Sequence, residues 1–242
     1  MRVNARAQVL LALAAVTGAA ALLPAWLPLD GGVAIKTVLI GGALGALAWP
    51  WLRGRDAGLR LGAASQITLL RAALVVLLAA LLGERDAASL ALTAVALATL
   101  AALLDGVDGW VARRSNTATA FGARFDMETD AAMILVLALL AWQWGKAGAW
   151  VLLAGLVRYG FVAAAGVLAW LRRPLPPSRR RRAVCALQTA ALIACLAPAM
   201  PHPASALVAA AGLTALLLSF AVDIHWLARL ARAPGRRAAG AA

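Results

Sequence analysis

The chain has 242 residues, of which 64% are hydrophobic, and its mean hydropathy of +0.85 lies far above that of an ordinary soluble domain. Its formal net charge is +13 at pH 7, but no basic soluble domain is present to bind nucleic acid, so we exclude that partner. Ala and Leu dominate without an alternation of apolar and polar residues, which favours membrane helices over a membrane β-barrel.

Apolar stretches of membrane-spanning length fill most of the sequence. A bilayer core of about 30 Å requires roughly 20 apolar residues per helix. We therefore expect an all-α integral membrane protein, a bundle of about eight transmembrane helices in which two N-terminal helices precede a six-helix core. The expected spans are 8–28, 33–51, 66–83, 88–104, 131–145, 147–171, 183–200 and 204–228. The length of the first span, and the apolar segment directly after it, favour a membrane anchor over a signal peptide.

The basic residues predict the orientation of these spans. With eight spans, one side of the membrane has most of them: Arg2, Arg6, Arg53, Arg55, Arg60, Arg113, Arg114, Arg124, those in 172–182 and those in 229–237. The other side has only Lys36, Arg85 and Lys146. Because cytoplasmic loops retain Lys and Arg, both termini and the acidic segment after the fourth span are expected in the cytoplasm. We expect a multi-pass protein of the bacterial inner membrane.

Composition divides the chain into four segments. Residues 53–64 are polar and weakly amphipathic, which predicts a segment that lies along the membrane interface. This segment separates a two-helix N-terminal membrane extension at 1–52 from a six-helix core at 65–230. A basic cytoplasmic tail is expected at 231–242. A Gly-x-x-x-Gly spacing in the extension permits close helix contact, which leaves both packing within the bundle and a homodimer open.

Four aspartates lie in the short polar stretch between the fourth and fifth expected spans. Asp105 and Asp108 are three residues apart, and Asp126 and Asp130 are four apart, so each pair shares one face of a helix. Two such helices facing each other would gather four carboxylates, and divalent cations are the usual way to neutralise that charge. Hard oxygen ligands favour Mg²⁺ or Mn²⁺, and we expect two such ions. Incidental helix capping would not explain the small residues beside these aspartates.

Small and basic residues accompany the aspartates. Gly109 and Ala112 remove side-chain bulk where a phosphate or nucleotide approaches the backbone, and Gly122 allows a close turn or helix crossing. Arg113 supplies a cation for a phosphate oxygen. This combination suits phosphoryl-type transfer, in which cations hold a diphosphate and one carboxylate takes a proton.

The acidic segment resembles the signature of the CDP-alcohol phosphatidyltransferases. That signature is Asp-x-x-Asp-Gly-x-x-Ala-Arg, then about eight residues, then Gly-x-x-x-Asp-x-x-x-Asp, and residues 105–130 match every fixed position. The resemblance implies that the first three aspartates bind two divalent cations, and that Asp130 completes the metal site and acts as the catalytic base. The likeness extends over about residues 62–228.

The same resemblance implies roles for further residues. The segment 65–71 is similar to the start of the family's first core helix, with Ser65 where Asn is common. Gln188, after the run Arg179–Arg182, is similar to an element of members with phosphorylated acceptors. The residues expected to contact the CDP portion of the donor are Thr68, Asp105, Gly109, Ala112, Arg113 and Thr119.

Two arginines are candidates for the acceptor site. Arg158 lies near the middle of the sixth expected span, where a lone charge requires a partner or an aqueous cavity. Acceptor binding explains this charge, and so does pairing with a bundle carboxylate such as Asp223. For Arg182, a contact with an acceptor phosphate and attraction to anionic membrane lipids both remain open.

The resemblance implies an enzyme that transfers a phosphatidyl group from a CDP-linked lipid, expected to be CDP-diacylglycerol, to a small alcohol with release of CMP. Glycerol 3-phosphate is the favoured acceptor, and inositol phosphate, serine, choline or a second lipid are the alternatives. Outside this class, a membrane prenyltransferase also combines Asp-rich motifs with Mg²⁺ but lacks the Gly-x-x-Ala-Arg element. A transporter would use intramembrane charges, but the sequence shows no inverted repeat.

Overall fold

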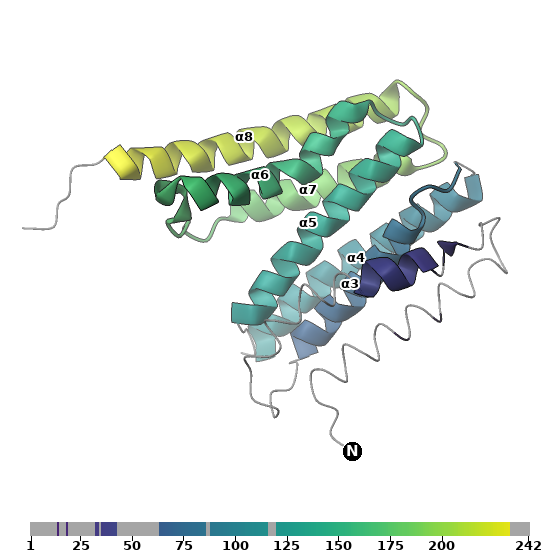
Figure 1. Ribbon diagram of the computed structural model, residues 1–242, viewed down its shortest axis with the longest axis horizontal. Helices are drawn as coiled ribbons and strands as arrows, with labels where there is room; N and C mark the ends of the chain where they lie inside the picture. Colours follow the sequence, from purple (N-terminus) through teal and green to yellow (C-terminus); the bar gives the residue numbers. More distant parts are fainter. Residues whose placement is uncertain are drawn as a thin grey trace, which may run out of the picture.

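The computed structural model describes residues 14, 18, 32–33, 35–42, 63–85, 88–115 and 120–232, and all regular secondary structure in these residues is helical (Figure 1). The body consists of α3 (Ala63–Ala80), α4 (Ala88–Ser115), α5 (Ala120–Gln143), α6 (Leu153–Val167), α7 (Arg179–Leu196) and α8 (Ala204–Arg232). Short 3-10 helices, η2 (Ala149–Leu152) and η3 (Ala169–Arg172), flank α6. The predicted all-α fold class is therefore confirmed.

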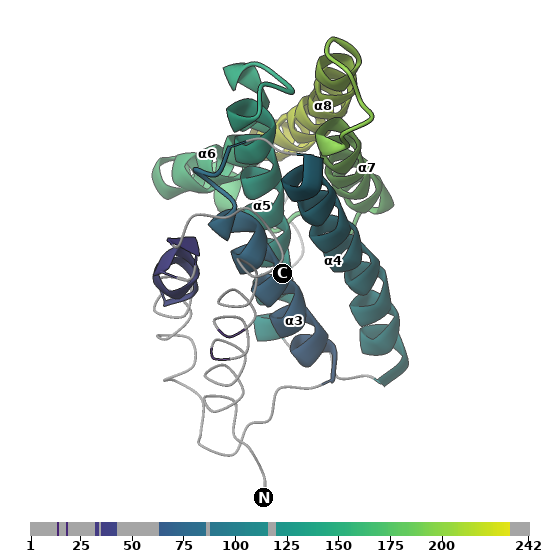
Figure 2. The same ribbon diagram turned by 90° about the vertical axis from the view of Figure 1, so that its right-hand side faces the viewer.

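Two pairs of helices pack around α5. α3 and α4 lie side by side, and so do α7 and α8 (Figures 1 and 2). α5 contacts α3 and α7, and α6 packs against it as the chain returns. The core between them is made mainly of Leu and Ala, and Leu78, Leu137 and Leu192 are each 0% exposed. Burial of these side chains specifies the packing, because interiors are as dense as organic crystals.

A hydrogen-bonded cluster closes one end of the bundle. Glu84, in the turn after α3, is only 4% exposed, and its Oε1 lies 2.6 Å from Lys36 Nζ. The Glu84 carbonyl accepts hydrogen bonds from Gln143 Nε2 at 2.6 Å and from Trp144 Nε1 at 3.2 Å. These contacts join residues 35–42 of the N-terminal extension to the α3–α4 turn and to the end of α5.

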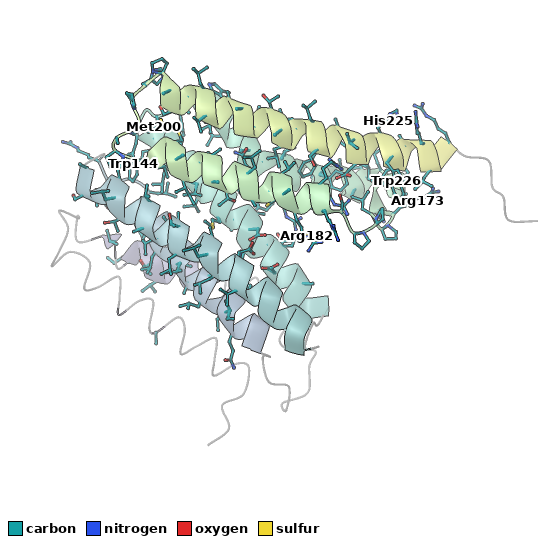
Figure 3. All side chains as sticks on the ribbon, turned by 180° about the vertical axis from the view of Figure 1, so that it is seen from behind. Trp144, Arg173, Arg182, Met200, His225 and Trp226 are labelled. Atoms are coloured by element: carbon teal, nitrogen blue, oxygen red, sulfur yellow. The ribbon has the colours of Figure 1, made fainter. Side chains whose placement is uncertain are left out.

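The two ends of the molecule differ in character. Figure 3 shows Trp144 and Met200 at one end, with Arg173, Arg182, His225 and Trp226 at the other. We call these the closed end and the basic end.

Three described segments are long and apolar enough to cross a membrane: Ala88–Val107, Ala149–Val167 and Ala204–Arg232. The chain is a helical membrane protein, as predicted, although its described part does not reach the expected number of about eight helices. That part contains about seven helices: the six α-helices of the body and the helical segment at 35–42. The expected first span, 8–28, lies outside the described residues except for residues 14 and 18.

Charge explains why α5 and α7 differ from the expected spans. α7 begins with four arginines at 179–182, so its apolar part covers only about 14 residues, or about 21 Å, against a bilayer core of about 30 Å. α5 begins at Ala120, well before the expected 131, because its first turns carry the acidic segment. The predicted interfacial segment at 53–64 lies almost wholly outside the described residues. The predicted tail at 231–242 starts within α8, which continues to Arg232.

α5 and α6 approach each other closely at a glycine. A Cβ placed on Gly155 would lie 2.6 Å from the Cα of Leu135. Because that atom belongs to the backbone, it cannot move aside without shifting α5. Gly155 therefore sets the separation of the two helices, and α6 carries Arg158 one turn further along.

We expect Gly155→Ala to destabilise the protein, because overpacking a close contact costs about 1–3 kcal/mol. The apparent unfolding temperature in detergent should fall by several degrees. Gly160→Ala is the matched control in the same helix, because nothing lies within 4 Å of its added Cβ. Since Ala is the better helix former, this variant should be as stable as the wild type or more so. Equal losses in both variants would contradict the close-contact explanation.

Candidate active site

Three of the four predicted aspartates converge on one buried arginine. Arg71 of α3 forms ion pairs with Asp105 of α4 and with Asp126 and Asp130 of α5. Its Nη2 lies 2.9 Å from Asp105 Oδ1 and also contacts Asp130, while Nη1 contacts Asp126. A guanidinium presents its N–H donors in a fixed planar fork, so one arginine can hold carboxylates from two helices.

The arginine and the carboxylates differ sharply in exposure. The Arg71 side chain is 1% exposed, whereas those of Asp105, Asp126 and Asp130 are 44%, 38% and 30% exposed. One oxygen from each carboxylate lies within 4.8 Å of the others. The three carboxylates therefore form a compact oxygen cluster that is accessible from outside, with a cation on its buried side.

This cluster fits a divalent cation. Three carboxylates exceed the charge of one guanidinium, and their oxygens are the hard donors that Mg²⁺ and Mn²⁺ prefer. The fourth predicted ligand, Asp108, follows Asp105 by one turn in α4, but its side chain lies outside the described residues. The described part of the chain thus gathers the other three in one place.

The predicted CDP contacts are only partly described. Thr68 is buried on α3, three residues before Arg71 and on the same face of the helix. α4 includes Gly109, Ala112 and Arg113, which lie beyond the last residue of α4 whose side chain the structure describes. Thr119 lies outside the described residues.

α7 brings its N-terminal half to the same site. α7 packs against α4 and α5, the helices that carry the three carboxylates, and Cys185 in its N-terminal half is partly buried against the core. Arg182 is exposed, precedes Cys185 by three residues and shares its helix face. Gln188, three residues beyond Cys185, is fully buried against α8. This face of α7 therefore runs from the basic end into the core.

Arg158 pairs with a residue other than the one considered above. Its Nη2 lies 2.5 Å from Glu128 Oε1, so Arg158 does pair with a bundle carboxylate, but the partner is Glu128 and not Asp223. Asp223 Oδ1 instead lies 2.5 Å from Arg180 Nη2 and 3.5 Å from Arg181 Nη1, because α8 is packed against α7. Glu128 lies on the opposite face of α5 from Asp126 and Asp130 and is directed toward α6.

Sequence reasoning assigned no role to Arg71, the residue on which the site converges. A signal was present, because Arg71 is a lone charge within the apolar helix Gln66–Ala80 and such charges usually face a partner. The same argument did single out Arg158. What the sequence lacked was the information that α3 lies against both α4 and α5.

Comparison with known families decides the class of this protein. The profile of the CDP-alcohol phosphatidyltransferase family matches residues 61–223, about two thirds of the chain. The chain belongs to this family. CDP-alcohol phosphatidyltransferases are transferases of substituted phosphate groups and pass a phosphatidyl group from a CDP-alcohol to an alcohol acceptor, generally with a divalent metal. Membership therefore decides against a prenyltransferase or a transporter. Searches of curated proteins and solved structures found no match.

We expect Asp126→Asn to weaken binding of Mn²⁺ at least about tenfold, because it removes a charged ligand from the cluster. Binding can be measured by electron paramagnetic resonance of free Mn²⁺ during titration of the purified protein. Glu128→Gln is the matched control: it makes the same chemical change two residues away, at a side chain paired with Arg158. Similar weakening in both variants would mean that general negative charge, rather than the cluster, holds the ion.

Proposed function

We propose that this CDP-alcohol phosphatidyltransferase transfers the phosphatidyl group of CDP-diacylglycerol to glycerol 3-phosphate, with release of CMP. The observation that carries the proposal is the solvent-accessible cluster of Asp105, Asp126 and Asp130. The basic end of the same bundle is rich in arginines. A negatively charged site that holds divalent cations suits a diphosphate donor. The basic residues around it suit an anionic acceptor.

Each aspartate has a role in this proposal. Asp105, Asp108, Asp126 and Asp130 hold two divalent cations, Mg²⁺ or Mn²⁺, which when bound neutralise the diphosphate and stabilise the departing phosphate. Asp130 also accepts the proton of the acceptor hydroxyl. The acceptor oxygen forms a bond to the phosphorus that carries the lipid, and the bond from that phosphorus to CMP breaks. The proton ends on Asp130, so charge and atoms balance.

The nucleotide is assigned to the α3–α4 side of the site. Gly109 and Ala112 let the CDP portion approach the α4 backbone, and Arg113 binds a phosphate oxygen. Thr68 and Thr119 complete this set as polar contacts. The lipid tails of the donor stay in the bilayer, because the site lies at one end of membrane-embedded helices.

The acceptor is assigned to the α6–α7 side. Arg182 lies in the first turn of α7, which packs against α5, so an acceptor phosphate held by Arg182 would lie beside the helix that carries Asp126 and Asp130. Arg158 would reach this subsite only by leaving Glu128, which lies on the opposite face of α5 from Asp126 and Asp130. Inositol phosphate would use the same arginines, whereas serine or choline would leave these arginines without a phosphate partner.

The topology supports a cytoplasmic site in the bacterial inner membrane. Exposed arginines at the basic end include Arg172, Arg173, Arg179, Arg182, Arg229 and Arg232. Because Lys and Arg are retained on the cytoplasmic side, this end faces the cytoplasm, where water-soluble acceptors are available. The donor then enters sideways from the membrane.

We expect the purified protein to release CMP from CDP-diacylglycerol when glycerol 3-phosphate and Mg²⁺ or Mn²⁺ are present, and to stop when the metal is chelated. Acceptors are tested one at a time, so the panel identifies the acceptor as well as the reaction. Asp130→Asn should lower kcat by about 10²- to 10⁴-fold, the usual contribution of a general base. Full CMP release by this variant would show that Asp130 is not the general base. Release that depends only on serine or choline would replace the acceptor assignment.

We expect Arg182→Gln to raise KM for glycerol 3-phosphate about tenfold, because it removes a charge-assisted hydrogen bond to phosphate. Activity with an unphosphorylated alcohol should change little. The control is Arg229→Gln, since Arg229 is also an exposed arginine of the basic end but lies on α8. A KM that rises equally in both variants would indicate general attraction to the basic surface.

A further inference from the structure

We propose that Arg71 is a positioning residue: a permanent internal cation that holds the carboxylates of α4 and α5 in metal-binding geometry and keeps its place when the ions bind. The proposal rests on the proposed function only for the presence of divalent cations at Asp105, Asp126 and Asp130. It assigns to α3 a part in the site that the aspartate motif does not contain.

Arg71 reaches the carboxylates from the buried side of the cluster. Its side chain is 1% exposed, whereas the three carboxylates are 30–44% exposed. The guanidinium therefore contacts the cluster from the protein interior, and an ion or diphosphate would arrive from the exposed side. Arg71 and an incoming cation approach the same carboxylates from opposite directions and need not compete.

Arg71 lies on the buried face of α3. Thr68, Arg71, Val75 and Leu78 lie along one face of α3, and all four are buried, with exposures of 3%, 1%, 2% and 0%. If the guanidinium left the carboxylates, it would remain among these buried side chains and near apolar ones. An unpaired charge in such surroundings is costly, so the arginine stays with its partners.

The planar guanidinium of Arg71 binds the carboxylates in fixed directions. Two of its nitrogens contact carboxylates from two different helices, with Nη2 shared between Asp105 and Asp130. A lysine could supply the same charge, but as a single ammonium point it lacks the planar fork that fixes these directions. Charge and orientation can therefore be separated by substitution, which makes the proposal testable.

The experiment titrates Mn²⁺ into the wild type, Arg71→Lys, Arg71→Met and the control Lys36→Arg, with free Mn²⁺ followed by electron paramagnetic resonance. Arg71→Lys is the decisive variant, because the charge is kept and only the fork is lost. We expect it to bind Mn²⁺ about 10- to 100-fold more weakly, the usual effect of losing a partner that orients metal ligands. Lys36→Arg also exchanges one cation for another, in the ion pair with Glu84 at the closed end, and this variant should bind Mn²⁺ as the wild type does.

Unfolding temperatures measured in chelator and in saturating Mn²⁺ provide a second readout. In Arg71→Met the three carboxylates repel one another without a cation, so we expect a large loss of stability in chelator that Mn²⁺ partly restores. The increase on adding Mn²⁺ should therefore exceed that of the wild type. If Arg71→Met does not fold in chelator but folds in Mn²⁺, the expected pattern is met in its strongest form. If it folds in neither, the Arg71→Lys titration decides.

Three results would overturn the proposal. Equal Mn²⁺ affinity in the wild type and Arg71→Lys would reduce Arg71 to an ordinary structural ion pair. Tighter binding in Arg71→Lys would show that the arginine competes with the ion. CMP release by the wild type is measured in parallel: a protein that binds Mn²⁺ but releases no CMP would remove the proposed donor and acceptor and leave the result for Arg71 standing. A wild type that binds no Mn²⁺ would overturn the positioning role itself.

Discussion

The contact between Arg71 and three carboxylates is the interaction on which the rest of the site depends. It joins α3, α4 and α5 at one point, and these helices come from segments up to 59 residues apart. Carboxylates gathered this closely repel one another, and the guanidinium offsets part of that repulsion from the buried side. The exposed side is thereby left for cations and for the diphosphate of the donor. A requirement of catalysis, clustered negative charge, thus becomes compatible with a stable membrane bundle.

The two ends of the bundle solve different problems. At the closed end, Glu84 is held by Lys36, Gln143 and Trp144, which joins the N-terminal extension to the core through polar contacts. At the basic end, the helices carry exposed arginines that the apolar interior could not solvate. This division also explains why α5 and α7 are poor membrane spans by composition. The first turns of α5 carry Asp126 and Asp130, and α7 begins with Arg179–Arg182, so only the remaining turns of the two helices are apolar.

α5 has two functional faces within a single turn. Asp126 and Asp130 are directed toward Arg71, and Glu128 between them is directed toward Arg158 of α6. Because the close contact at Gly155 sets the distance between α5 and α6, it also sets the reach of Arg158. The carboxylate cluster and the Arg158–Glu128 ion pair therefore lie on opposite sides of one helix. A shift of α5 would affect both at once.

The sequence by itself determined the class of this protein and predicted the aspartates of its candidate site. The spacing of Asp105, Asp108, Asp126 and Asp130 with Gly109, Ala112 and Arg113 is a local pattern, which can be recognised without knowledge of the fold. Hydropathy likewise predicted an all-α membrane protein, because lipid permits few other structures. Only the tertiary structure decided which distant charges meet. Arg71 reaches three aspartates, and Arg158 pairs with Glu128 rather than Asp223, because helix packing sets those distances and no sequence spacing encodes them.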